Sequence, residues 1–282
     1  MQILVTGTNG QVGSELQFLA KQYPDFSFIF VDKEDLDITN AQAINAFFAK
    51  HSFDYCINCA AYTAVDKAES ETAIATAVNH LAVQHLAAAC QTQGTRLMQL
   101  STDYVYHNEQ NTPFKEDDVT NPQGVYAQTK LDGDLAALQY DNAVVIRTSW
   151  VYSSFGNNFV KTMLRLGTDR DQLTIIFDQI GSPTYARDLA QAMLDIIQQK
   201  PAEFSGIYHY SNEGVCSWFD FAKAIFDYKK IHCKTSPIET KDYPTPAKRP
   251  HFSLLNKAKI KATFDLEIPY WRDSLIACLD LL

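Results

Sequence analysis

Apolar and polar positions follow two alternating patterns in the first half of the chain. Short apolar runs typical of buried strands are each followed by a longer segment whose apolar residues have helical spacing. The predicted strands are residues 2–6, 27–31, 54–60, 96–100 and 143–148, and the predicted helices are residues 11–21, 40–51, 67–93 (one helix, or two in tandem) and 126–139. This alternation predicts an α/β fold with a doubly wound parallel sheet and helices on both faces.

The alternation becomes less regular after Trp150. The pattern predicts helices at residues 157–166, 186–199 and 217–228, and short strands at residues 173–177 and 206–209. We therefore predict a first domain at residues 1–150, to which later segments return, and a smaller C-terminal lobe formed mainly by residues 151–282.

Four prolines crowd one segment near the end of the chain: Pro237, Pro244, Pro246 and Pro250. Proline lacks the backbone N–H that helices and sheets use and interrupts both. The segment is predicted to be an ordered loop that covers a site or the surface of the lobe.

The net charge and the hydropathy of the chain argue against nucleic-acid binding and against a membrane-spanning protein. The 282 residues carry a net charge of −9, and no run of Lys and Arg offers a nucleic-acid-binding surface. No stretch approaches the ~18 apolar residues of a membrane span. The apolar run at the start of the chain is cut by Thr6 and Gly7, so no signal peptide is expected and the protein is predicted to be cytoplasmic.

Six scattered cysteines are expected to be reduced thiols, and two of them, Cys56 and Cys59, form a C-x-x-C pattern. Because they lie in a predicted strand, residues three apart point to opposite faces. Packed thiols are therefore favoured over a redox pair or half of a zinc site.

A glycine-rich turn links the first predicted strand to the first predicted helix. Gly7 allows a tight turn, Gly10 lets the backbone approach phosphates, and Gly13 lets the helix sit against the strand. Phosphates bind at such a turn because the helix N-terminus presents free N–H groups. The G-x-x-G-x-x-G spacing predicts a Rossmann-type dinucleotide site.

Acidic residues at the end of the second strand bear on the choice of cofactor. Asp32 can accept hydrogen bonds from ribose hydroxyls and repel a 2′-phosphate, which favours NADH, whereas the adjacent Lys33 can pair with that phosphate. The cofactor is therefore NADH or NADPH. Asp37 either belongs to a capped helix start or contacts the adenine.

Three residues combine into a candidate catalytic set. Tyr126 and Lys130 lie four apart in a predicted helix and so share a face, although this spacing is also common on amphipathic helices. A nearby lysine cation is expected to lower the phenol pKa and prepare it for acid–base chemistry. Thr102, at the carboxyl end of the fourth strand, can hold a substrate carbonyl against the tyrosine.

The sequence resembles the extended short-chain dehydrogenase/reductases, and within them the branch that reduces dTDP-linked 4-keto sugars. The resemblance covers residues 3 to about 275. Its motifs are Gly10 to Gly13, Asp35 to Ile38, Ala60 to Glu69, Ser101 to Val105, Tyr126 to Leu131, Arg147 to Tyr152, Gly156 to Phe159, Gly181 to Thr184, Gly206 to His209 and Arg249-Pro250.

The resemblance implies NAD(P)H-dependent reduction of the 4-keto group of dTDP-4-dehydro-6-deoxy-L-mannose to dTDP-L-rhamnose by a monomer or homodimer. Tyr126 would be the proton donor, Lys130 would serve the tyrosine and the nicotinamide ribose, and Thr102 would orient the carbonyl. Asp103 and Trp150 would contact the sugar, and Arg249 would bind the diphosphate. The residues implied to line the cofactor, besides the three glycines and the catalytic pair, are Gln11, Val12, Asp32, Asp37, Ile38, Ala60, Ala61, Tyr62 and Thr63.

Departures from the family pattern are few. Ala127 replaces the glycine usual after the tyrosine, Gly133-Asp134 replaces a Gly-Glu, and Asn108 replaces another glycine. Some relatives hold a magnesium ion between glutamates. Glu15 matches one such ligand, but Arg187 aligns with another, so no metal is expected.

Two other functions stay open. A nucleotide-sugar epimerase or dehydratase shares the glycine turn and the Tyr/Lys pair but retains its NAD. The other is a non-catalytic, nucleotide-binding regulatory subunit. The presence of all three candidate catalytic residues, Tyr126, Lys130 and Thr102, argues against it.

Overall fold

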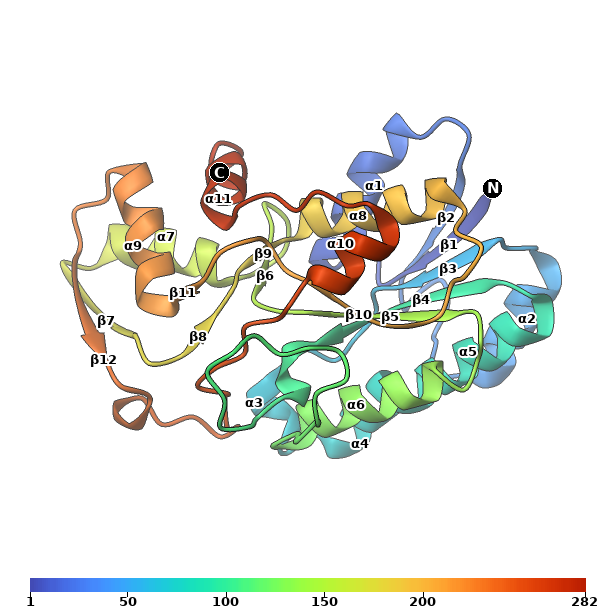
Figure 1. The fold of residues 1–282 in the computed structure, drawn as a ribbon, viewed down its shortest axis with the longest axis horizontal. Coiled ribbons are helices and arrows are strands. Elements are labelled where there is room, and N and C mark those ends of the chain that lie inside the picture. Colours follow the sequence, from blue (N-terminus) through green and yellow to red (C-terminus); the bar gives the residue numbers. More distant parts are fainter.

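A six-stranded parallel sheet forms the centre of the molecule (Figure 1). The computed structural model describes residues 1–282. The strand order is β10 (Gly206–Tyr210), β5 (Ala143–Thr148), β4 (Arg96–Thr102), β3 (Tyr55–Asn58), β1 (Gln2–Thr6) and β2 (Ser27–Val31). Every neighbouring pair is parallel. The predicted sheet is confirmed, and β10, from the second half of the chain, pairs with β5 at its edge.

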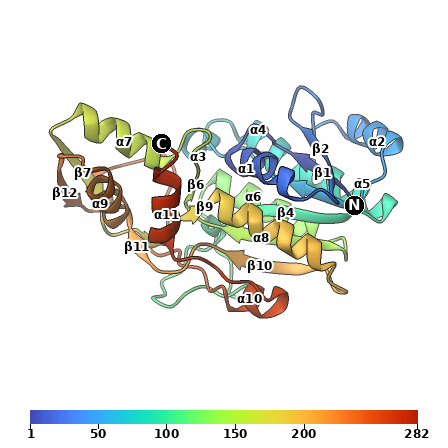
Figure 2. The same cartoon turned by 90° about the horizontal axis from the view of Figure 1, so that it is seen from above.

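Helices cover both faces of the sheet, as Figure 2 shows from above. One face packs against α1 (Gln11–Leu19), α8 (Ala186–Gln199) and α10 (Ala258–Phe264), and the other against α2 (Ala41–Lys50), α5 (Ala82–Gln93) and α6 (Val125–Ala137). Side chains alternate across a strand, so Ile3 and Val5 belong to the first core and Leu4 to the second. Successive residues of one strand are thus buried in different cores, so the sheet is covered on both faces. The predicted doubly wound fold is confirmed.

Of the two forms predicted for residues 67–93, one helix or two in tandem, the structure has the second: a short helix is followed by a continuous helical run that ends at Gln93. The chain forms α3 (Val65–Ala68), α4 (Thr72–Thr76), a π-helical turn η2 (Ala77–Leu81) and then α5. The Glu69 carboxylate, at the end of α3, accepts a hydrogen bond from the backbone N–H of Val125, at 2.8 Å. Asn79, in the π-helical turn, bonds to the backbone of Tyr62. Single π-helical turns inside α-helices are frequent at functional sites.

A smaller lobe lies beyond the carboxyl edge of the sheet, on the left in Figure 1. Its core is formed by α7 (Phe159–Asp169), α9 (Trp218–Lys229), α11 (Trp271–Leu279) and the parallel pair β7 (Gln172–Ile176) and β12 (Lys234–Ile238). Two short strand pairs link the lobe to the sheet: β6 (Val151–Tyr152) with β9 (Thr184–Tyr185), and β8 (Ile180–Gly181) with β11 (Cys216–Ser217). The 3₁₀ turns are η1 (Ala20–Gln22), η3 (Asp103–Val105) and η4 (Thr240–Asp242).

The expectation of irregular structure throughout the proline-rich segment is wrong at Pro237. This residue lies in β12, opposite Ile175 of β7. Because β12 pairs with β7 alone, it has a free edge, where the missing N–H of proline is tolerated. Pro244, Pro246 and Pro250 lie outside helices and strands, as predicted.

The cysteines behave as packed thiols. Cys56 lies in the core against α2 and α5, Cys59 packs against the core on the opposite face, and all six thiols are free. No helix has the length and apolar character needed to cross a bilayer.

Candidate active site

The glycine turn between β1 and α1 forms a cradle with no room for side chains. Gly7 has a φ of +67°, and a Cβ on it would lie 2.6 Å from the backbone of Ala60. A Cβ on Gly13 would lie 2.5 Å from the carbonyl oxygen of Gly7. Gly10 caps α1 without a side-chain hydrogen bond, so the first N–H groups of the helix have no side-chain acceptor. This geometry fits the pyrophosphate of a dinucleotide.

The residues predicted for the adenosine end lie beside this cradle. Asp32 accepts hydrogen bonds from the backbone N–H of Asn9 at 2.8 Å and of Lys33 at 2.7 Å. Asp37 accepts from the backbone and hydroxyl of Thr39, in the loop before α2, whose cap is Asn40. The side chains of Val12 and Ile38 are buried in the two cores, so their backbone atoms are what they can present to a nucleotide.

The loop after β3 is held by a residue that sequence reasoning missed. Asn79 accepts a hydrogen bond from Tyr62 N at 2.8 Å and donates to Tyr62 O at 3.1 Å. Its amide also reaches the hydroxyl of Thr129 on α6, at 3.3 Å. Asn79 thus ties the loop that contains Ala60, Ala61, Tyr62 and Thr63 to the helix that carries Tyr126. The sequence feature that could have indicated this role is an asparagine within an alanine-rich helical segment.

Tyr126 lies in the first turn of α6, with its ring edge against Tyr104 at a centroid distance of 5.6 Å. Burial raises the pKa of Tyr126 to about 12, and a hydrogen bond with Thr102 opposes this rise. The expectation of a lowered Tyr126 pKa is not met, because burial outweighs the effect of the Thr102 hydroxyl, which favours the phenolate. At neutral pH the phenol keeps its proton.

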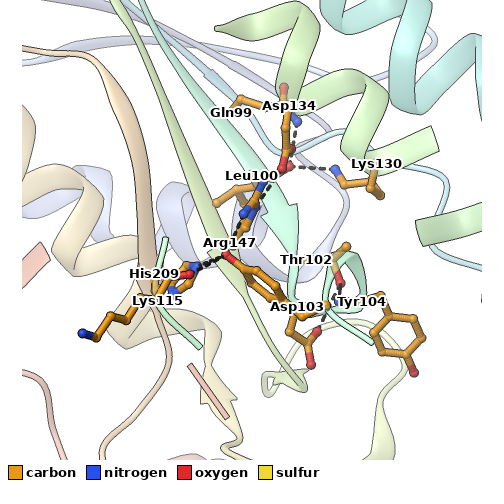
Figure 3. A network of polar contacts seen from close by, with 11 residues as sticks. Gln99, Leu100, Thr102, Asp103, Tyr104, Lys115, Lys130, Asp134, Arg147 and His209 are labelled. Carbon is orange, nitrogen blue, oxygen red and sulfur yellow. Dashed lines mark hydrogen bonds and ion pairs between the residues drawn. The ribbon is translucent and has the colours of Figure 1, made fainter. Parts of the chain in front are cut away.

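Lys130 is held by the sheet. Its side chain is 3% exposed, and Nζ donates to the carbonyl oxygen of Leu100 on β4 at 2.7 Å (Figure 3). The carbonyl of Leu100 also accepts from Gln99, at 2.6 Å. Burial lowers the pKa of Lys130 to about 8, and the carboxylate of Asp134 opposes this fall.

Asp103 follows Thr102 at the end of β4, where Figure 3 shows both. Its side chain is 2% exposed, and the Thr102 hydroxyl donates to its Oδ1 at 3.2 Å. Burial raises the pKa of Asp103 to about 7. The structure therefore brings Thr102, Asp103, Tyr126 and Lys130 together at the carboxyl edge of the sheet.

The C-terminal lobe contains a cleft of about 670 Å³, between α7, β7, β12 and the start of α9. Trp218, Tyr243 and Arg249 are among its lining residues. Arg249 forms an ion pair with Asp66 of α3, with Nη2 and Oδ2 2.8 Å apart, which sequence reasoning did not predict. Arg249 thereby connects the lobe to the first domain.

Trp150 does not line this cleft but stacks on Trp218, which does. The ring centroids are 3.7 Å apart and the planes differ by 11°. Trp150 has a φ of +50°, unusual for a bulky residue, and its indole lies against Gly181, where a Cβ would approach to 3.0 Å. Trp218 was missed because the two tryptophans are far apart in sequence.

Glu15, which resembles a metal ligand of some relatives, is fully buried and paired with a guanidinium. The Nε of Arg187 lies 2.7 Å from its Oε2, and the Ser153 hydroxyl donates to its Oε1 at 2.7 Å. A cation of the chain itself therefore neutralises this carboxylate. No group of three or more His, Cys, Asp or Glu side chains is arranged to hold a metal ion.

Comparisons with known proteins agree with this geometry. The family model of the RmlD substrate binding domain matches residues 1–282. The dTDP-4-dehydrorhamnose reductase of Sinorhizobium fredii is 39% identical, over 97% of this chain and 95% of its own, and that of Aggregatibacter actinomycetemcomitans is 37% identical, over 97% of both.

Solved structures give the same result. The dTDP-4-dehydrorhamnose reductase of Clostridium acetobutylicum superimposes with a TM-score of 0.96 at 41% identity, covering 100% of this chain and 99% of its own. That of Bacillus anthracis, in complex with NADP, superimposes with a TM-score of 0.94 at 35% identity and the same coverage. A dTDP-glucose 4,6-dehydratase of Streptomyces venezuelae, at 18% identity and a TM-score of 0.79, shares the fold. The chain belongs to the RmlD family, together with the dTDP-4-dehydrorhamnose reductases.

Proposed function

We propose that the protein is an NAD(P)H-dependent oxidoreductase that reduces the 4-keto group of dTDP-4-dehydro-6-deoxy-L-mannose to give dTDP-L-rhamnose. The observation that carries this proposal is the arrangement of Tyr126, Thr102 and Lys130 at the sheet edge where the glycine cradle ends. Membership of the RmlD family supports the substrate class.

The high pKa of Tyr126 suits an acid rather than a base. When bound, the reduced nicotinamide supplies the hydride for the C4 carbon. Tyr126 then donates its phenolic proton to the carbonyl oxygen, and the Thr102 hydroxyl, which lies near the phenol, orients the carbonyl. The resulting phenolate is stabilised by Thr102 and by the nearby Lys130 cation.

The residues present fit the cofactor. Gly7, Gly10 and Gly13, with the N–H groups of Gln11 and Val12, would hold the pyrophosphate. Asp32 and Asp37, with the backbone of Ile38, would hold the adenosine, and residues 60–63 would face the nicotinamide half. Lys130 would turn its remaining N–H groups toward the nicotinamide ribose, since one is already given to Leu100.

The cleft in the C-terminal lobe suits the substrate. A nucleoside diphosphate is an anion, and the net charge of −9 means that its site needs local cations. Arg249 at the cleft supplies a planar guanidinium that matches diphosphate oxygens. Asp103 and Trp150 would contact the sugar between this cleft and Tyr126.

The deciding experiment follows the absorbance of NADH and NADPH separately while the dTDP-keto-sugar is formed in situ from its precursors. We expect stoichiometric oxidation of at least one cofactor. Turnover of the sugar without consumption of the added cofactor would identify an epimerase or dehydratase, and cofactor binding without turnover would identify a regulatory subunit.

A further inference from the structure

A buried ion pair lies directly behind Lys130. Asp134 is 1% exposed and Arg147 is 2% exposed, and the Arg147 Nε lies 3.0 Å from Asp134 Oδ2 (Figure 3). The guanidinium is held on its other side by the hydroxyl of Tyr106, at 2.6 Å, which in turn contacts His209 Nε2 at 2.8 Å. Arg147 is therefore fixed in place as a permanent cation beside Asp134.

The second oxygen of Asp134 makes no hydrogen bond within 3.5 Å, although the buried Ser101 hydroxyl, which also lacks a partner, lies near enough to favour the ionised carboxylate. Oδ1 is buried, although an ionised carboxylate has acceptor sites on both oxygens. Asp134 lies four residues after Lys130 on α6, so the two side chains share a helix face inside the protein. A buried carboxylate and a buried ammonium thus share one helix face without forming an ion pair within 4 Å, and the carboxylate favours the charged form of the lysine.

Few other groups act on the Lys130 charge. The groups that oppose the lowering of its pKa are Asp134 on α6 and Cys59 after β3. Burial raises the pKa of Cys59 far above neutral, so this thiol carries no charge. Tyr126, one turn earlier on α6, is likewise protonated at neutral pH. Asp134 is consequently the anion that faces the lysine, and Arg147 of β5 opposes the rise of the Asp134 pKa that burial causes.

We propose that Asp134 is a positioning residue for the reduction, because it keeps the ammonium of Lys130 in its charged form at the site. The Arg147 cation of β5 favours the ionised form of Asp134, and the Asp134 anion favours the protonated form of Lys130. The charge of an arginine on the sheet thereby influences the protonation state of the catalytic lysine on α6. The inference rests on the proposed function only for its catalytic consequence. The charge coupling itself can be measured without substrate.

A purely structural role predicts a different result. If Asp134 only anchors Arg147 between α6 and β5, its replacement changes stability and leaves the Lys130 titration where it was. Asp134→Asn separates the two roles, because it removes the charge but keeps the shape and an oxygen that can accept from the Arg147 Nε.

The experiment titrates the protein carrying ¹³Cε-labelled lysine by NMR, with the Lys130 resonance assigned by its loss in Lys130→Arg. The Lys130 pKa in Asp134→Asn should fall by about one pH unit or more, the size expected for loss of a close opposite charge. Asp134→Glu should restore the titration. Asp132→Asn removes a carboxylate that binds Gln128 on the same helix. It is the matched control and should leave the Lys130 pKa unchanged.

Turnover measured across the same pH range then links the charge to the reaction. The alkaline limb of kcat should move down with the Lys130 pKa in Asp134→Asn alone. An unmoved Lys130 titration overturns the inference, whatever the activity. A moved titration with an unmoved pH profile leaves the coupling intact and contradicts instead the role given to Lys130 under the proposed function.

The wild-type protein provides a test that does not depend on the folding of a variant. Its Lys130 resonance should show a second, smaller shift in the acid range, when Asp134 takes up a proton. A Lys130 resonance with a single inflection across the folded range would also overturn the inference.

Discussion

Lys130 donates its hydrogen bond to the carbonyl oxygen of Leu100, at 2.7 Å, and not to Tyr126 one helical turn earlier. The Tyr126 phenol instead lies near the Thr102 hydroxyl, which favours the phenolate and so opposes the rise of its pKa. Leu100 and Thr102 are two residues apart on β4, so one strand holds both members of the pair. The distance between phenol and ammonium is therefore set by the packing of α6 on the sheet as well as by the spacing within the helix.

Removing the phenolic hydroxyl should remove the acid and little else. Tyr126→Phe keeps the ring that packs on Tyr104. We expect turnover to fall by roughly 10²–10⁴, the contribution of a positioned acid, with nearly unchanged NADPH binding. Stopped-flow kinetics and a fluorescence titration of NADPH measure the two quantities. Wild-type turnover in the variant would refute the assigned role.

Arg249→Ala should weaken substrate binding. Loss of charge-assisted hydrogen bonds to the diphosphate corresponds to an increase of roughly 10- to 100-fold in KM for the sugar nucleotide. The ion pair with Asp66 is partly exposed, so the free energy of unfolding should change by less than about 1 kcal/mol. Lys248→Ala removes an exposed neighbouring cation and is the control. A change confined to the KM of the cofactor would contradict the assignment.

Two glycines with similar backbone angles should respond differently to alanine. Gly94 caps α5 with a φ of +77°, and a Cβ there meets nothing within 4 Å, so Gly94→Ala should cost only about 1–2 kcal/mol for the left-handed conformation. Gly7→Ala adds a collision with Ala60 at 2.6 Å. We expect a larger drop in Tm and loss of NADPH binding for Gly7→Ala alone. Equal effects of both variants would argue against a close-fitting cradle.

Asp103 should make stability depend on pH in a defined window. Its pKa is raised by burial from its ordinary value near 4 to about 7, so between these values the folded protein holds a proton that the unfolded chain releases. The free energy of unfolding should therefore fall as the pH rises from about 4 to about 7. In Asp103→Asn this contribution disappears. The free energy of unfolding of the variant minus that of the wild type, measured by urea denaturation, should therefore be larger at pH 8 than at pH 5. A difference between the proteins that is the same at both pH values would contradict the burial argument.

Local patterns were sufficient for the architecture and the chemical groups. Strand–helix alternation determined the doubly wound sheet because apolar periodicity reports burial within a single element. The glycine spacing and the Tyr126–Lys130 spacing likewise belong to one turn and one helix. These features depend on residues close in sequence, so the sequence by itself specified them.

Contacts between distant segments were decided by the tertiary structure. The Arg249–Asp66 pair joins residues 183 apart, and Asn79, in the π-helical turn, bonds to the backbone of Tyr62, 17 residues away. Pro237 enters a strand because the fold gives β12 a free edge. The pKa of Tyr126 rises, against the expectation from Lys130, because burial outweighs the effect of Thr102, and the ammonium of Lys130 is bound to Leu100. Charge and hydrogen bonding in a folded site depend on burial and on partners brought together by packing, and the pattern of one segment contains neither.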